Sequence, residues 1–273
     1  MATASEYLGA TGCLAARAHC FVSIVKYLCV AATVTCLPIG AQIAEPILVK
    51  TAIPFAPGSG AVKLDYAGGI GRSGGSSQVI PEATVEMGIG KGLEVLARFP
   101  LLRIRPASGG RAVIAGGELA VGARYLVAGG AECAYAVAVQ AIVEAPTGNT
   151  RLVGNATQVM PAIFADWRPA RQIVVHSDLM FDRSVGGTGS GSGFFGYGNA
   201  VVWLATKHFV PVLEFVGNTN TITGTTQLVE QPEVILRVGP HWELKAGLTF
   251  GLNPRTPHLG LRAQVDWFWG KRK

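Results

Sequence analysis

The chain has 273 residues, of which 49% are hydrophobic and 15% charged, with 36 glycines, five cysteines and a formal net charge of +6. The apolar content excludes intrinsic disorder. Past residue 45 no charge-free apolar run of about 18 residues occurs, which excludes a multi-span helical membrane protein. A glycine-rich, apolar chain without long apolar runs is typical of a transmembrane β-barrel.

The first 44 residues predict a secretory signal peptide. Basic residues precede an uncharged run over 27–44, and Ala41 and Ala44 offer small-residue cleavage sites. A retained N-terminal helical anchor and a lipoprotein are the alternatives. Four of the five cysteines lie in this segment, so cleavage would leave only Cys133. We therefore expect no internal disulfide, and we expect no metal site because the chain lacks a CxxC pair or a His/Cys cluster.

The rest of the chain shows the period-two alternation of strands with one apolar face. Most segments are ten to sixteen residues long, which suits tilted membrane-spanning strands of about 9–11 residues better than the strands of soluble sheets. The pattern predicts an all-β, antiparallel, up-and-down barrel of about 12 strands, with 10–14 as the alternative. The expected strands are 61–71, 78–89, 92–103, 112–128, 131–146, 157–167, 172–182, 194–206, 207–218, 230–240, 241–251 and 257–269.

The charged residues keep to one face of each strand. In 241–251, for example, Glu243 and Lys245 alternate with Trp242 and Leu244. In a membrane barrel this charged face would point into the lumen. The lumen-lining candidates are Lys63, Asp65, Glu82, Glu86, Glu94, Arg98, Glu118, Arg124, Glu144, His176, Asp178, Glu233, Arg237, Glu243, Lys245, Arg262 and Asp266.

A soluble sandwich would also alternate, with its apolar face inward. Two further patterns favour the membrane. Short turns interleave with longer Gly/Ser/Thr/Asn loops, as in bacterial barrels, and aromatic residues gather at strand ends on the apolar face. The expected girdle at one rim consists of Tyr125, Tyr135, Trp167, Trp242, Trp267 and Trp269.

The domain organisation follows from these segments. Residues 1–44 are the expected signal peptide, 45–60 an N-terminal periplasmic lead-in, 61–270 the barrel and 271–273 a basic tail. An even strand count places both ends of the barrel in the periplasm. We expect the bacterial outer membrane as the location, with its lipid and lipopolysaccharide as partners and no nucleic acid.

Two stretches resemble a known family. Gly117-Glu-Leu-Ala-Val-Gly-Ala-Arg-Tyr-Leu-Val127 and Ile142-Val-Glu-Ala-Pro-Thr-Gly-Asn149 are similar to the "G-A-[KR]-Y" and "P-T-G" strands of the bacterial outer-membrane family named for the MetA pathway of phenol degradation. The resemblance covers about residues 60–270. It implies an outer-membrane barrel that transports hydrophobic or aromatic compounds. The chain departs from many barrels in continuing past its last aromatic residue as Gly270-Lys-Arg-Lys273.

The lumen candidates contain more acids than bases. This favours a charge-lined passage for cations or polar solutes, and the alternative is that cross-strand ion pairs simply fill a narrow interior. The sequence predicts a channel or transporter for small molecules that works by passive diffusion and carries no cofactor. Loops 147–156 and 183–193 would gate the outer mouth or bind substrate there. A non-conducting structural or surface-binding barrel is the alternative.

A barrel lipid hydrolase is the less favoured alternative. His176 shares a strand face with Asp178, which would suit a base and its orienting acid, but Ser177 points to the opposite face. We therefore expect no catalytic residue and no enzymatic activity.

Overall fold

The computed structural model describes residues 45–70, 76–105, 111–148, 155–187 and 193–270. The expected signal peptide and basic tail lie outside these residues, as do parts of the two loops expected to gate the outer mouth. Among the described residues no helix is long and apolar enough to cross a membrane.

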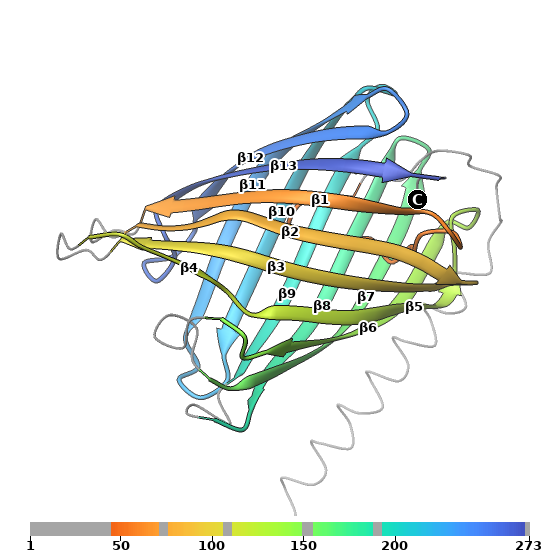
Figure 1. Cartoon of the computed structure of the whole chain (residues 1–273). Coiled ribbons are helices and arrows are strands. Elements are labelled where there is room, and N and C mark those ends of the chain that lie inside the picture. Colours follow the sequence, from red (N-terminus) through yellow and green to blue (C-terminus); the bar gives the residue numbers. More distant parts are fainter. Residues whose placement is uncertain (1–44, 71–75, 106–110, 149–154, 188–192, 271–273) are drawn as a thin grey trace, which may run out of the picture. The chain divides into compact units, whose positions relative to one another are not determined.

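The described residues form one closed antiparallel sheet (Figure 1). Its strands are β1 Gly60–Ile70, β2 Ser76–Gly90, β3 Leu93–Arg105, β4 Val113–Gly116, β5 Leu119–Gly129, β6 Tyr135–Ala145, β7 Thr157–Ala170, β8 Ile173–Val185, β9 Gly193–Trp203, β10 Phe209–Asn220, β11 Thr226–Val238, β12 Trp242–Gly251 and β13 Leu259–Trp269. Apart from β4 and β5, which both pair with β3, each strand pairs with its sequence neighbours, and β1 pairs with β13. Closure pairs both edges of the described strands other than β4, which pairs with β3 alone.

The wall has twelve strand positions, because β4 and β5 lie end to end beside β3. Arg98 of β3 pairs with Ala120 of β5, whereas Leu101 pairs with Gly116 of β4. Between them Gly117 donates its N–H to the carbonyl of Pro100 at 2.8 Å. A Cβ at Gly117 would lie 2.6 Å from Pro100 Cγ, so the break requires glycine. The single strand expected over 112–128 is thus one wall position with an interruption.

The connections have two to five residues at one end of the barrel and five to eleven at the other, so the predicted difference in length holds for most of them. One end of the barrel, here called the short-turn end, carries residues 91–92, 130–134, 171–172, 204–208 and 239–241. At the other, the long-loop end, lie the strand ends Ile70, Arg105, Ala145, Val185, Asn220 and Gly251. Gly60 and Trp269, where the wall begins and ends, are paired at the short-turn end.

The outer surface is apolar. Leu119, Val121 and Val127 of β5 alternate outward and are 39–57% exposed, and the other strands expose similar rows of Val, Leu, Ile and Phe. An apolar surface that runs around a whole sheet far exceeds the patch of a few hundred Å² that soluble monomers expose. It matches the lipid-facing band of an outer-membrane barrel.

Candidate functional site

The predicted lumen residues all lie on the inner face of the wall. Ten are buried, namely Lys63, Glu86, Glu94, Glu118, Arg124, His176, Glu233, Glu243, Lys245 and Asp266. Seven are partly exposed to the interior, namely Asp65, Glu82, Arg98, Glu144, Asp178, Arg237 and Arg262. Their inward position follows the period-two pattern, and their role in lining a passage for solutes remains a prediction.

Most of these charges form cross-strand ion pairs. Arg237 and Glu243 are direct partners in the β11–β12 register and lie 3.1 Å apart. Lys245 lies 2.8 Å from Asp266, and Lys63 lies 2.8 Å from Glu86. The remaining pairs are Arg124–Glu94 at 3.5 Å, Arg262–Asp65 at 3.6 Å, Arg98–Glu82 at 3.9 Å and the closely joined Arg98–Glu144. Pairing offsets the cost of burying these charges.

Residues 45–59, here called the internal segment, lie inside the barrel. This corrects the expected periplasmic lead-in over 45–60. From β1 the segment turns back into the short-turn half of the lumen and contacts the inner wall strand after strand: β2, β3, β5, β7, β10, β11 and finally β12 and β1. From Glu45 to Phe55 only Leu48 and Lys50 are not fully buried.

Wall carboxylates hold the internal segment through its backbone. Five backbone N–H groups and one hydroxyl donate to four acids. The bonds run from Ile47 N to Glu233 (3.1 Å), Leu48 N and Val49 N to Glu214 (2.9 and 2.7 Å), Thr51 Oγ1 and Ala52 N to Asp166 (2.6 and 3.0 Å) and Phe55 N to Glu94 (2.9 Å). Hydrogen bonds to an ionised acceptor are about twice as strong as neutral ones. The segment is therefore firmly but non-covalently attached.

Wall cations and apolar residues complete the attachment. Lys63 binds the Glu45 carboxylate at 2.7 Å, and Lys245 donates to the Glu45 carbonyl at 2.7 Å. Val49 packs in an apolar cluster with wall residues of β8 to β11, and Phe55 packs against Phe268 with ring centroids 6.2 Å apart. The acids of the lumen that exceed its bases are thus bound by the internal segment, which lies outside the strands.

Arg124 is a fully enclosed cation of the wall. Its guanidinium donates to Gln140 at 3.0 Å and to the Thr51 carbonyl at 3.1 Å, and it lies 5.0 Å from the centroid of the Phe164 ring. The side chain is 1% exposed and that of its partner Glu94 is not exposed. Arg124 therefore links the wall to the internal segment.

His176 belongs to the same attachment network. Its Nδ1 lies 2.7 Å from Asp166 Oδ1, whereas the sequence suggested Asp178 as the orienting acid. Asp166 is also bound by Thr51 and Ala52, and all of these groups are buried. Ser177 instead bonds Asn199 on the other face of the wall. The imidazole and the Thr51 hydroxyl thus bind the two oxygens of one carboxylate.

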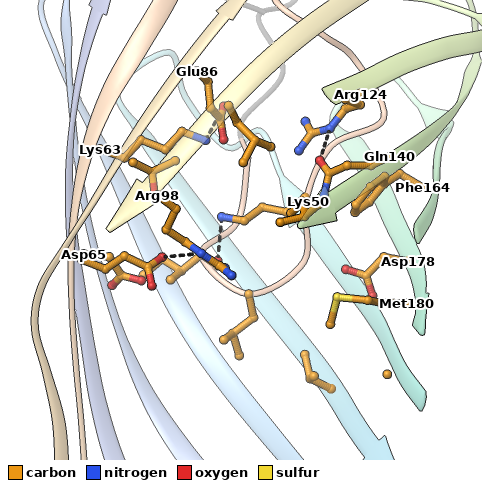
Figure 2. Close-up of a pocket in the computed structure, with 18 of the residues that line it drawn as sticks. Lys50, Lys63, Asp65, Glu86, Arg98, Arg124, Gln140, Phe164, Asp178 and Met180 are labelled. Carbon is orange, nitrogen blue, oxygen red and sulfur yellow. Dashed lines mark hydrogen bonds and ion pairs between the residues drawn. The ribbon is translucent and has the colours of Figure 1, made fainter. Parts of the chain in front are cut away.

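A cavity of about 320 Å³ lies between the internal segment and the wall (Figure 2). Lys50 of the internal segment extends into it, with its ammonium 3.1 Å from the Ile47 carbonyl and 3.7 Å from Glu45. Neither the internal segment nor Lys50 was recognised in the sequence, because 45–59 has neither strand periodicity nor a charge pattern.

The predicted girdle aromatics gather on the outer surface at the short-turn end. Tyr135 is paired with Trp167, and Trp242 with Trp267. Trp267 and Trp269 are ring neighbours at 5.8 Å. Tyr125 is also exposed near this end. Contact of these rings with a membrane interface remains a prediction.

The fold has close counterparts among solved structures. The chain superposes on the COG4313 outer membrane channel from Pseudomonas putida F1 with a TM-score of 0.64 at 12% identity, covering 83% of this chain and 100% of that one. It has the fold of an outer-membrane channel. The KdgM porin gives a TM-score of 0.54 at 9% identity over 77% of this chain and 100% of its own. KdgM in complex with disordered oligogalacturonate gives 0.55 at 8% identity over 78% and 99%.

No protein-family model matches the sequence, and no curated protein matches it significantly. At identities of 8–12% the structural matches establish the fold alone. The finer resemblance to the MetA-pathway family remains a prediction. Among the described residues no group of three or more His, Cys, Asp or Glu side chains is placed to hold a metal ion.

Proposed function

We propose that the protein is an outer-membrane channel that passes small molecules by passive diffusion. One observation carries this proposal: the short-turn half of the lumen is filled by a single non-covalently attached segment and not by side chains of the wall alone. A barrel that only scaffolds a surface needs no such separable part. The likeness to channels and porins supports a transport role and a non-enzymatic one.

Passage in this proposal requires the internal segment to move. Its attachment consists of hydrogen bonds, ion pairs and apolar contacts, all of which can exchange with water. The acid excess does not by itself favour cations, because Asp166, Glu214, Glu233 and Glu94 accept backbone N–H groups. Loops 147–156 and 183–193 would control the long-loop mouth, and the apolar outer face would contact lipid and lipopolysaccharide.

The second candidate function is a non-conducting structural barrel. The extent of the same attachment favours it. From Glu45 to Phe55 the internal segment is almost entirely buried and is bonded to wall strands around the lumen. If this attachment never opens, the barrel cannot conduct.

Swelling of proteoliposomes in L-arabinose, together with single-channel conductance, separates the two candidates. We compare the full chain with the double variant Asp166→Asn/Glu214→Gln, which keeps the side-chain shapes but removes the charges that hold three N–H groups and one hydroxyl. The channel predicts several-fold faster swelling and more frequent conductance steps in the variant. Glu118→Gln, whose carboxylate accepts from Gln158 instead, is the matched control. Absence of swelling and of steps in all three proteins would leave the structural barrel.

A further inference from the structure

The cavity beside the internal segment has two chemically different walls. Figure 2 shows Lys50 reaching between them, with Lys63, Glu86 and Asp65 on one side. On the other side Phe164 and Met180 lie beside the polar residues Arg124, Gln140 and Asp178. The volume of about 320 Å³ lies at the small end of the range for ligand pockets. This inference rests on the proposed function, because it names the class of solute that the same lumen holds.

The apolar wall interrupts rows of charged residues at a common level. Leu96 stands between Glu94 and Arg98 on the inner face of β3, and Ile142 and Met180 have similar polar neighbours on β6 and β8. Leu96, Gly122, Ile142 and Met160 are successive partners in the β3–β5–β6–β7 register. A Cβ at Gly122 would lie 2.7 Å from Ile142 Cγ1, so this glycine leaves room for the Ile142 side chain. A continuous apolar surface therefore faces the lumen.

Two cations of the polar wall have close carboxylate partners, whereas Arg262 lies 3.6 Å from Asp65. Lys63 lies within 2.8 Å of Glu45 and of Glu86, and Arg98 is closely joined to Glu144. Lys50 differs from Lys63 and Arg98, because among the described residues its close acceptor is the Ile47 carbonyl at 3.1 Å and its carboxylate neighbour Glu45 is 3.7 Å away. An ammonium group has three donors. The 31% exposed side chain of Lys50 therefore offers donors to the cavity.

We propose that this cavity binds a small organic anion with an apolar body. The carboxylate of the ligand accepts from Lys50 Nζ, and its ring or short chain packs on Leu96, Phe164 and Met180. The class follows from the juxtaposition of an incompletely bonded ammonium group and an apolar wall in one lumen cavity. Neither a sugar nor an inorganic ion would use both surfaces.

A cationic ligand is the competing occupant. Asp65 Oδ1 is buried without a hydrogen-bond partner, although Arg262 lies 3.6 Å from the other oxygen of this carboxylate. Asp178, beside the apolar wall, accepts a hydrogen bond from the Lys50 backbone N–H. The anion is favoured because Lys50 projects from the internal segment between both walls, whereas Asp65 lies on the polar wall beside its own cation.

Equilibrium dialysis against the full chain in amphipol tests the proposal with four probes: benzoate, benzyl alcohol, benzylamine and acetate. Benzoate should bind most tightly, because only it offers both a carboxylate and a ring. Lys50→Met keeps the apolar stem and removes the charge, so it should weaken benzoate about tenfold or more and leave benzyl alcohol unchanged. Met180→Gln should weaken benzoate and benzyl alcohol alike. Lys91→Met, at an exposed turn residue, is the matched control and should change nothing.

Several outcomes would overturn the proposal. Benzylamine binding as tightly as benzoate would assign the cavity to cations, and benzoate binding that survives Lys50→Met would remove the ammonium from the site. Failure of benzoate to bind would also refute it. Because dialysis needs no conduction, the two proposals fail separately: the predicted binding pattern without swelling refutes only the channel, and swelling without that pattern refutes only this site.

Discussion

At the scale of single residues, Arg124 shows how the barrel tolerates charge in its interior. Its guanidinium has an acid, an amide, a carbonyl and an aromatic ring around it, contributed by four different parts of the chain. Removing one partner of such a buried pair leaves the other charge without compensation. We expect Arg124→Leu to lower the free energy of unfolding by about 3–5 kcal/mol, measured by denaturant titration in lipid vesicles.

Arg262 provides the matched control. Its guanidinium lies 3.6 Å from Asp65, but both side chains are partly exposed to the lumen, at 30% and 18%. Solvent screening reduces the contribution of such an ion pair to the free energy of unfolding to about 1 kcal/mol or less. Arg262→Leu should therefore lower the free energy of unfolding much less than Arg124→Leu does. Equal losses would mean that enclosure by the internal segment does not distinguish the two sites.

At the scale of elements, the position of the internal segment next to β1 depends on one glycine of β2. A Cβ at Gly88 would lie 2.2 Å from the Phe55 carbonyl oxygen and 2.4 Å from that of Ala56. Gly88 also exchanges hydrogen bonds with Gly58 and Ser59 at 2.9 Å. We expect Gly88→Ala to push the segment from the wall, to lower the free energy of unfolding by about 1–3 kcal/mol and to expose residues 45–59 to added protease.

Gly90 is the control for this prediction, because it lies two residues further along the same strand. The atom nearest to a Cβ there is Leu93 Cβ at 3.8 Å, an ordinary contact. Gly90→Ala should change the unfolding free energy by less than about 0.5 kcal/mol and leave the segment protected. Equal protease sensitivity of the two variants would show that crowding at Gly88 does not position the segment.

The same scale shows how far the sequence could predict this protein. The strands and their faces were predictable because a period of two moves every side chain of a strand together, so Glu243 and Lys245 had to share a face. The internal segment was not, because backbone N–H groups hold it, and these leave no mark in the residue types of 45–59. The sequence did contain one indication: the acids of the predicted inner face outnumber its bases. In the structure the surplus acids Asp166, Glu214 and Glu233 accept hydrogen bonds from the internal segment. Unpaired acids in a predicted lumen indicate a missing donor.

At the scale of the whole molecule, the apolar outer surface separates a membrane barrel from a soluble one. Val121 lies near the middle of the combined β4–β5 position and is 51% exposed. In a bilayer an arginine at such a depth costs about 2–4 kcal/mol, whereas in water it would be almost neutral. We expect Val121→Arg to lower the free energy of unfolding in phospholipid vesicles by that amount. Ile222→Arg, at a 68% exposed residue of the loop over 221–225, should have no effect. If both variants fold as well as the unchanged chain, the outer surface does not face lipid, and the proposed channel loses its membrane.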